Sequence, residues 1–158
     1  MEKTLFFAYG SLMDIEKMAD YCPDAKPYGT GWLTGGKLRF KGDIGKALVT
    51  IETASETSKV PVVAWEISKA DMKAIEALVG FPENYYKHLV WLGIKEAHTG
   101  IVSPKLGVTF VRNHKAEIAT PSEEYYNLLV DIYQNMGFPT KILKDAFDYS
   151  ACYIHRKE

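Results

Sequence analysis

The chain has 158 residues, of which 47% are apolar and 25% are charged, with a formal net charge of −1. A chain of this length forms one core, so we expect a single domain over residues 1–158. The near-neutral charge gives no reason to expect a nucleic-acid partner, and the apolar runs are far shorter than the roughly 20 residues that cross a bilayer. We therefore expect a soluble protein without nucleic-acid or membrane partners.

The two cysteines, Cys22 and Cys152, are far apart in the sequence, and the first residues lack the charged and then apolar pattern of a secretion signal. Both features are typical of a protein in a reducing compartment. The sequence therefore predicts a cytoplasmic protein, and we do not expect a disulfide.

The first part of the chain predicts a strand, a turn and a helix. Residues 4–9 are apolar and aromatic and lead into Gly10, which is typical of a buried strand followed by a turn. Residues 14–21 are predicted to be helical.

The next part predicts strands separated by glycine-rich turns. We interpret residues 28–36 and 42–45 as these turns because of their glycine content. The strands themselves are predicted at residues 38–41, 47–51 and 60–67. We expect these three strands to be neighbours in one sheet.

The second half predicts helices that alternate with strands. Ser68 and Asp71 stand close to a capping-box pattern, and apolar residues follow at helical spacing as far as Gly80. Strands are expected at residues 85–94 and 106–111. A helix capped by Thr120, with Pro121 as its first residue, is expected to end before Gly137, followed by a short helix over residues 140–147. The short connections favour an α+β fold with a small mixed barrel, and we expect Trp32, Trp65 and Trp91 in its core.

The turn formed by Tyr9, Gly10, Ser11 and Leu12 is the first candidate site. Gly10 can adopt a positive φ, and the turn presents successive backbone N–H groups with a helix N-terminus behind them, an arrangement that attracts an anion. Ser11 can donate to a bound carboxylate or cap the following helix, and Tyr9 can form a wall of the pocket. Taken alone, this turn also fits a plain chain reversal.

The segment Phe-Ala-Tyr-Gly-Ser-Leu at residues 7–12 resembles the N-terminal signature of the γ-glutamylcyclotransferase-like family. Further resemblances follow in the family's order at Gly45 with Ala47 and Ile51, at residues 60–67, at Gly80 with Tyr86, at residues 120–125, and at residues 137–139. Together they cover nearly the whole chain.

The resemblance implies an α+β fold with a small mixed β-barrel and surrounding helices. It implies that the α-amine of a γ-glutamyl group attacks its own γ-amide carbonyl, which gives 5-oxoproline and releases an amine or peptide. It also implies that Tyr9, Gly10, Ser11, Leu12 and Tyr86 bind a small molecule with a carboxylate, without a cofactor.

The chain departs from this resemblance at the residue that would carry protons during the cyclisation. The resemblance implies a glutamate directly before Gly80, where this sequence has Val79. Val79 lies four residues after Ile75, so we expect it in the core, on the inward face of the helix. Our candidate for the carrier is Glu83, which follows in the loop.

Other carboxylates and the histidines are weaker candidates. Glu76 and Asp43 are more simply explained as solvated side chains. The four histidines, His88, His98, His114 and His155, lack the spacings of zinc sites, so we expect no metal, although His88 could share a strand face with Tyr86 and act as a base. Two functions stay open: an enzyme that cyclises or transfers a γ-glutamyl-type acyl group, and a non-catalytic small-ligand-binding protein. The sequence leaves the oligomeric state open.

Overall fold

The computed structural model describes residues 3–157 and the side chains of residues 3–154. These residues divide into two compact units, the first made of residues up to 33 together with 61–111, and the second of residues 34–60 together with 112 onward. The chain passes between the two units three times. The organisation of residues 1–158 as one domain stays a prediction.

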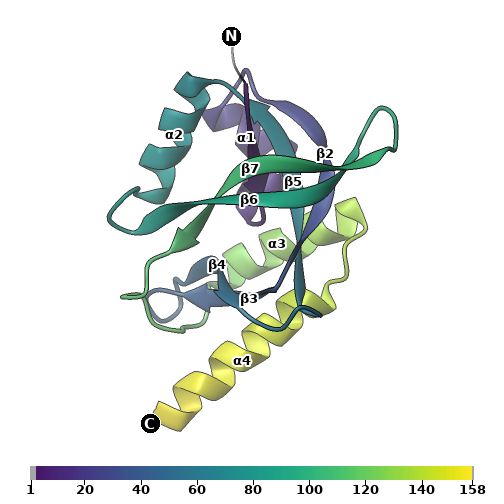
Figure 1. The fold of residues 1–158 in the computed structure, drawn as a ribbon. Helices are drawn as coiled ribbons and strands as arrows, with labels where there is room; N and C mark the ends of the chain where they lie inside the picture. Colours follow the sequence, from purple (N-terminus) through teal and green to yellow (C-terminus); the bar gives the residue numbers. More distant parts are fainter. Residues whose placement is uncertain (1–2, 158) are drawn as a thin grey trace. The chain divides into compact units, whose positions relative to one another are not determined.

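The first unit is built on a closed β-barrel (Figure 1). Its strands are β1 (Thr4–Ala8), β2 (Lys26–Thr34), β5 (Lys59–Ile67), β6 (Tyr85–Glu96) and β7 (Val102–Arg112). They follow the order β1-β5-β2-β6-β7, and a parallel contact between Phe6 and Val108 closes the ring. The predicted α+β fold with a small mixed barrel is therefore confirmed.

β1 is held on both sides by its neighbours. It pairs antiparallel with β5, with Thr4 opposite Ile67 and Ala8 opposite Val63, and it contacts β7 on its other side. The hydroxyl of the fully buried Thr109 donates to the Phe7 carbonyl at 2.8 Å. The turn that follows β1 therefore begins from a firmly positioned strand.

The prediction of a turn at residues 28–36 was wrong, because most of this stretch forms β2. A Cβ at Gly29 would lie 2.1 Å from the Lys95 carbonyl oxygen, and one at Gly31 would lie 2.6 Å from the Gly93 carbonyl oxygen. The glycines are present because the main chain of β6 passes directly over them, not because the chain turns there.

Two α-helices and one 3-10 helix complete the first unit. The 3-10 helix η1 (Ser11–Met13) leads into α1 (Ile15–Tyr21), and α2 (Lys69–Val79) follows β5. The Ser68–Asp71 capping box of α2 is present in both directions, and Gly80 ends the helix with φ 77°. These features of α2 confirm the sequence prediction.

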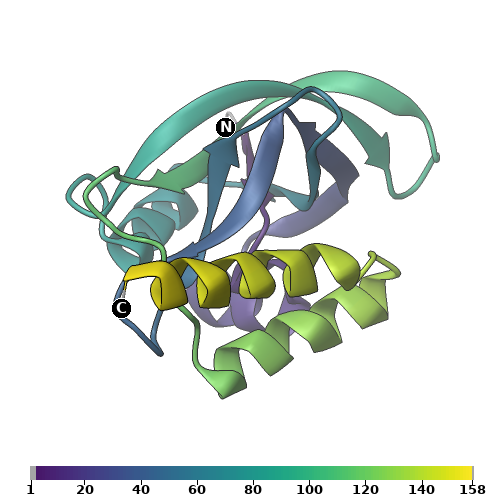
Figure 2. The ribbon, with the colours of Figure 1, turned by 90° about the horizontal axis from the view of Figure 1, so that it is seen from below.

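The second unit contains a separate two-stranded sheet and two helices. Its elements are β3 (Gly36–Lys41), β4 (Leu48–Thr53), α3 (Glu123–Met136) and α4 (Lys141–Lys157). β3 and β4 pair only with each other as strands, so the expectation of one sheet shared with β5 was wrong. The helices α3 and α4 lie side by side (Figure 2), and Phe40 of β3 packs against the rings of Tyr125 and Tyr126.

The start of α3 differs from the prediction. Ser122, not Thr120, is the N-cap, and its hydroxyl accepts a hydrogen bond from the Tyr125 N–H at 3.1 Å. The carbonyl of Thr120 instead accepts from the N–H groups of Gly45 and Ala47. Thr120 therefore holds the distant turn between β3 and β4 by hydrogen bonds, a contact that the local sequence does not reveal.

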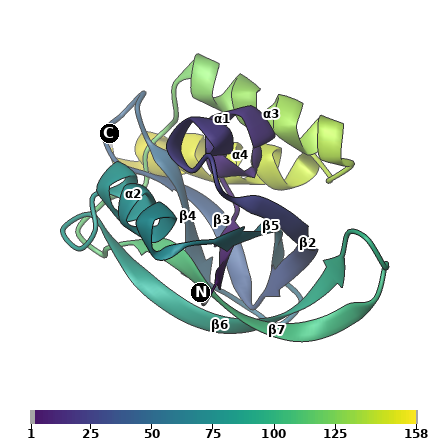
Figure 3. The same cartoon turned by 90° about the horizontal axis from the view of Figure 1, so that it is seen from above.

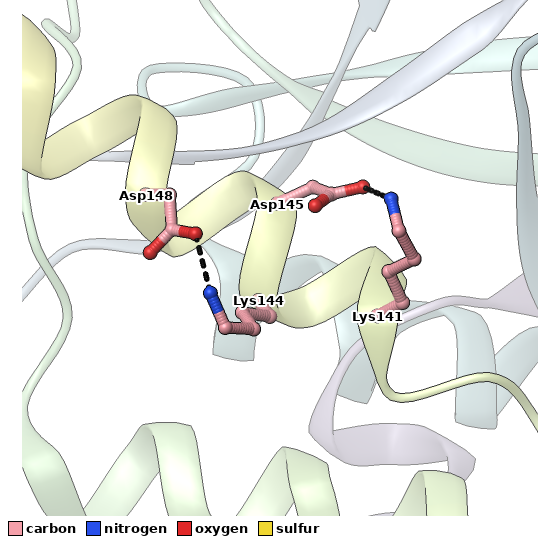
Figure 4. Close-up of polar contacts among 4 residues, drawn as sticks. All are labelled: Lys141, Lys144, Asp145 and Asp148. Atoms are coloured by element: carbon pink, nitrogen blue, oxygen red, sulfur yellow. Dashed lines mark hydrogen bonds and ion pairs between the residues drawn. The ribbon is translucent and has the colours of Figure 1, made fainter.

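α4 is much longer than the predicted helix at residues 140–147. Leu143, Ala146 and Ser150 are fully or almost fully buried, so one covered face continues past residue 147. On the exposed side, Lys141 and Lys144 form ion pairs at 2.8 Å with Asp145 and Asp148 (Figure 4). Such solvent-exposed pairs contribute little to the stability of a helix, because water and salt screen them.

The three tryptophans differ in burial. Trp65 is 2% exposed, as predicted, but Trp91 is 66% exposed and Trp32 is partly exposed. β6 is apolar on both faces, with Leu92 and Ile94 buried on the opposite face from Trp91. Apolar character alone therefore could not identify which face of β6 turns inward.

Candidate functional site

The candidate binding turn connects β1 to α1. Its hydrogen bonds leave three consecutive N–H groups without an acceptor. The N–H of Met13 donates to the Gly10 carbonyl at 3.0 Å, and that of Asp14 donates to the Ser11 carbonyl at 3.1 Å. Among the described residues, no protein acceptor is paired with the N–H of Gly10, Ser11 or Leu12. The turn therefore has donors that a bound anion or a carbonyl oxygen could use.

The backbone of the turn differs from the expected one. Gly10 has φ −122° and ψ −143°, so it does not use the left-handed region that its lack of a side chain would allow. The expectation of a positive φ was wrong. The following structure is a three-residue 3-10 helix, so the donors are local turn amides rather than the end of a long helix dipole.

Ser11 does not cap the following helix. Asp14 is the N-cap of α1, and its carboxylate accepts from the Lys17 N–H at 3.1 Å. The partly exposed Ser11 hydroxyl has no hydrogen-bond partner among the described residues. Of the two roles considered for Ser11, the capping role is excluded and the ligand role stays a prediction.

Leu12 and Tyr9 anchor the turn to the barrel. The Leu12 carbonyl accepts from the indole Nε1 of Trp65 in β5 at 3.0 Å. Tyr9 is 6% exposed, and its hydroxyl donates to the Phe110 carbonyl of β7. These two bonds attach the turn to strands on both sides of β1. Neither could be read from the sequence, because each acceptor is a backbone carbonyl of a distant residue.

The end of α2 lacks a carboxylate at the position that the resemblance implies. Val79 occupies it and is partly exposed, so the expectation of a core residue was wrong. The buried side chains of α2 are Ile75, about one turn before Val79, and Asp71, about two turns before it. Glu76 is partly covered, and its carboxylate lies 2.6 Å from the Lys87 ammonium, which also lies 4.8 Å from the Phe81 ring centre.

Glu83 lies in the short turn between α2 and β6, and its side chain is exposed. The turn is closed by a 2.8 Å hydrogen bond from the Asn84 N–H to the Gly80 carbonyl. The Asn84 side chain packs so closely that a Cβ at Gly80 would lie 2.5 Å from its nitrogen. Glu83 is therefore carried by a well-defined turn, and its role as proton carrier stays a prediction.

Tyr86 and His88 lie on β6 and are exposed. By the alternation of a strand they fall on the same face as the buried Leu92 and Ile94, beyond the part of that face that is covered. Tyr85, on the other face, is 6% exposed. β6 therefore places Tyr86 and His88 on one strand face, as expected from the sequence. Their contact with a ligand stays a prediction.

Asp43 is exposed in the turn between β3 and β4 and belongs to the second unit. His98 and His114 are exposed, and the side chain of His155 lies outside the described residues. Within the described part of the chain, no group of histidine, cysteine and carboxylate side chains could hold a metal ion. None of its helices combines the length and apolar character needed to cross a bilayer.

The two cysteines are free thiols. Cys22 is 1% exposed, and its thiol donates to the Asp71 carbonyl at 3.6 Å. Burial, and secondarily the charge of Asp71, raises the pKa of Cys22 to about 11. Cys152 is exposed on α4. Cys22 is therefore a packing residue and a poor nucleophile.

The arrangement of strands and helices matches solved structures over most of the chain. One of them is a γ-glutamyl cyclotransferase, with a TM-score of 0.76 and 21% identity, covering 92% of this chain and 86% of that one. The chain has the γ-glutamylcyclotransferase-like fold. An uncharacterized protein from Homo sapiens matches with a TM-score of 0.77 and 20% identity over 92% of this chain and 87% of that protein.

A third structure, YkqA from Bacillus subtilis, matches with a TM-score of 0.73 and 16% identity, covering 96% of this chain and 55% of YkqA. No protein-family model matches the sequence, and no curated protein matches it significantly. The chain is therefore similar to the γ-glutamylcyclotransferase-like structures in its fold.

Proposed function

We propose that the protein binds a γ-glutamyl-type amide at the turn of Tyr9, Gly10, Ser11 and Leu12 and cyclises it to 5-oxoproline, with release of an amine or peptide. The observation that carries the proposal is a set of three consecutive N–H groups, beside the Ser11 hydroxyl, that have no hydrogen-bond partner within the part of the chain that the structure describes. The γ-glutamylcyclotransferase-like fold of the chain agrees with this substrate class.

The turn offers the kind of donors that a carboxylate or a developing oxyanion needs. Backbone N–H groups fixed by a strand do not have to reorganise when negative charge appears next to them. The bonds from Trp65 to the Leu12 carbonyl and from Tyr9 to the Phe110 carbonyl hold the turn in place before a ligand arrives. We infer that the substrate carboxylate binds here, with Tyr86 as a further contact.

The cyclisation needs one group that moves a proton. The substrate α-amine must lose a proton before its nitrogen forms a bond to the γ-carbonyl carbon, and the departing amine must gain one as its C–N bond breaks. Because nucleophile and electrophile belong to one molecule, the ring closes with little help in orientation. We assign the proton transfer to Glu83, with the carboxylate as base in the first step and as acid in the second.

A second candidate function is non-catalytic binding of the same class of ligand. It is favoured by Val79, which places an aliphatic side chain where the family resemblance implies the acid. Glu76, the nearest carboxylate on α2, is already paired with Lys87 at 2.6 Å. In this alternative the turn binds the ligand and no proton transfer follows.

The experiment that separates these functions measures product and binding together. The chain is incubated with γ-glutamyl amines and dipeptides, 5-oxoproline is measured by mass spectrometry, and binding is measured by calorimetry. If Glu83 carries the proton, Glu83→Gln lowers turnover by about 10²-fold or more, while Glu56→Gln, in an exposed turn of the second unit, leaves it unchanged.

Saturable binding without product supports the non-catalytic alternative. Turnover that survives Glu83→Gln contradicts the role of Glu83. If neither binding nor product is found, both functions are excluded for these substrates. Val79→Glu provides an additional check, because it should increase turnover if the site lacks only its acid.

We also propose a cytoplasmic location, which agrees with the two free cysteines.

A further inference from the structure

Helices α3 and α4 border a cavity of about 400 Å³, a volume within the range of small-molecule sites. The two helices run side by side (Figure 3), and the cavity lies where α3 begins. Its lining residues all belong to the second unit: Thr120, Pro121, Ser122, Glu123, Tyr126 and Phe147. The turn of residues 9–12 belongs to the first unit, so a ligand of this cavity is independent of the proposed function.

Two aromatic rings, one from each helix, form the apolar wall of the cavity. The ring centres of Tyr126 and Phe147 are 5.3 Å apart, and the ring planes meet at 57°. The fully buried ring of Phe40 in β3 lies 6.2 Å from that of Tyr126. Tyr126 is therefore in contact with two other rings, so the wall is in place before a ligand arrives. Tyr126 and Phe147 are both partly exposed, which leaves ring surface for a ligand.

The charge at the start of α3 is negative. The Glu123 carboxylate lines the cavity, and it has no cationic partner among the described residues. Glu124 adds a second carboxylate in the same helical turn. A helix dipole places only about half a positive charge at the N-terminus, so the two carboxylates outweigh it.

The Tyr126 hydroxyl experiences the same sign of charge. Burial, and then the charge of Asp148, raises the pKa of Tyr126, and the opposite effect of Lys144 is smaller. Lys144 is paired with Asp148 at 2.8 Å, so it offers little net positive charge to a ligand. The cavity therefore favours a positively charged ligand over an anion, although it lies at a helix N-terminus.

We propose that this cavity binds a small organic ammonium ion, a primary amine in its charged form that carries an apolar group. The ammonium group donates to the Glu123 carboxylate and to the Thr120 hydroxyl, which has no hydrogen-bond partner in the described part of the chain. The apolar group packs against Tyr126 and Phe147, whose ring faces attract a cation within about 6 Å. A neutral molecule lacks the charge-assisted contact, and an anion is repelled by the two carboxylates.

The probe is phenethylammonium chloride, compared with phenethyl alcohol and hydrocinnamate, which are neutral and anionic compounds of similar shape. Calorimetry on the full chain measures Kd, and the ring proton shifts of Tyr126 and Phe147 locate the site. We expect phenethylammonium to bind saturably with a Kd of about 1 mM or lower, and both other compounds to bind at least about 10-fold more weakly.

Three variants test the contacts. Glu123→Gln should weaken phenethylammonium binding by about 5–10-fold and leave that of phenethyl alcohol unchanged. The matched control, Glu124→Gln, removes the same charge from the same helical turn, but Glu124 does not line the cavity. It should change Kd by less than about two-fold, because solvent and salt screen a charge that does not touch the ligand. Phe147→Leu keeps an apolar side chain without an aromatic face and should weaken binding by about 2–30-fold.

Circular dichroism checks that each variant is folded. The proposal is overturned if phenethylammonium shows no saturable binding at up to about 10 mM. Equal affinity for phenethyl alcohol also overturns it, because the negative charge would then play no part. Equal losses in Glu123→Gln and Glu124→Gln, or shifts that spare the rings of Tyr126 and Phe147, overturn it as well, because they would place the ligand outside the cavity.

Discussion

The contact between Gly107 and Phe7 fixes how closely β7 approaches β1, the strand that leads into the candidate turn. A Cβ at Gly107 would lie 2.5 Å from ring atoms Cε2 and Cζ of Phe7 and 3.0 Å from the Leu5 carbonyl oxygen. The Phe7 side chain is fully buried, so its ring has little room to retreat. We therefore expect Gly107→Ala to force β1 and β7 apart.

The size of the effect follows from two opposing terms. Overpacking a close-packed core destabilises by about 1–3 kcal/mol, and the lower entropy of alanine in the unfolded chain returns about 0.4–1 kcal/mol. Taking the middle of each range, the expected net loss for Gly107→Ala is about 1–2 kcal/mol in the free energy of unfolding. For a chain of this length, this corresponds to a decrease in Tm of about 2–8 °C.

The assay is urea unfolding of Gly107→Ala, Phe7→Leu and the double variant. Phe7→Leu alone should destabilise, because it removes buried ring atoms. In the double variant the alanine methyl occupies part of the vacated space. Its loss of unfolding free energy should therefore be smaller than the sum of the losses of the two single variants. A Gly107→Ala protein as stable as the wild type would refute the reasoning, and strictly additive losses would show that the two residues do not contact each other.

Two further predictions concern the N-cap of α2 and the two cysteines. Ser68→Ala removes the capping box of α2 and should lower the free energy of unfolding by about 0.5–2 kcal/mol in urea, whereas Ser68→Thr should retain most of it. In the folded protein at pH 8, iodoacetamide should modify Cys152 and not Cys22, as read by peptide mass spectrometry.

The raised pKa of Cys22 also predicts a dependence of stability on pH. Between the ordinary pKa of 9.0 and about 11, only the unfolded chain releases the Cys22 proton. The free energy of unfolding of the wild type should therefore fall relative to that of Cys22→Ala as the pH rises through this window. Parallel curves for the two proteins would show that the thiol pKa is the same in both states.

Local patterns predicted those elements whose signals lie within a few residues. β1, α1, α2 with its capping box, and the barrel class follow from apolar spacing and caps. The sequence also located the turn at residues 9–12. Its N–H groups that have no acceptor among the described residues agree with a site that can bind a hydrogen-bond acceptor.

The errors arose where a distant segment decides the structure. The glycine-rich stretch of β2 is a strand because the main chain of β6 passes within 2.1–2.6 Å of the Cβ positions at Gly29 and Gly31. Val79 has helical spacing from Ile75, but the covered face of α2 does not extend to it. Trp91 is apolar and lies in a strand, yet its face of β6 is uncovered.

In the proposed function, the backbone N–H groups of the turn at residues 9–12 bind the substrate carboxylate. The most direct measurement is a ¹⁵N-labelled amide spectrum of the chain during titration with a γ-glutamyl amide, compared with the same compound carrying a neutral amide in place of its α-carboxylate. We predict saturable shifts at Gly10, Ser11 and Leu12 with the carboxylate compound and much smaller shifts with the neutral one. Shifts of equal size with both compounds, or none at these three amides, would contradict the claim.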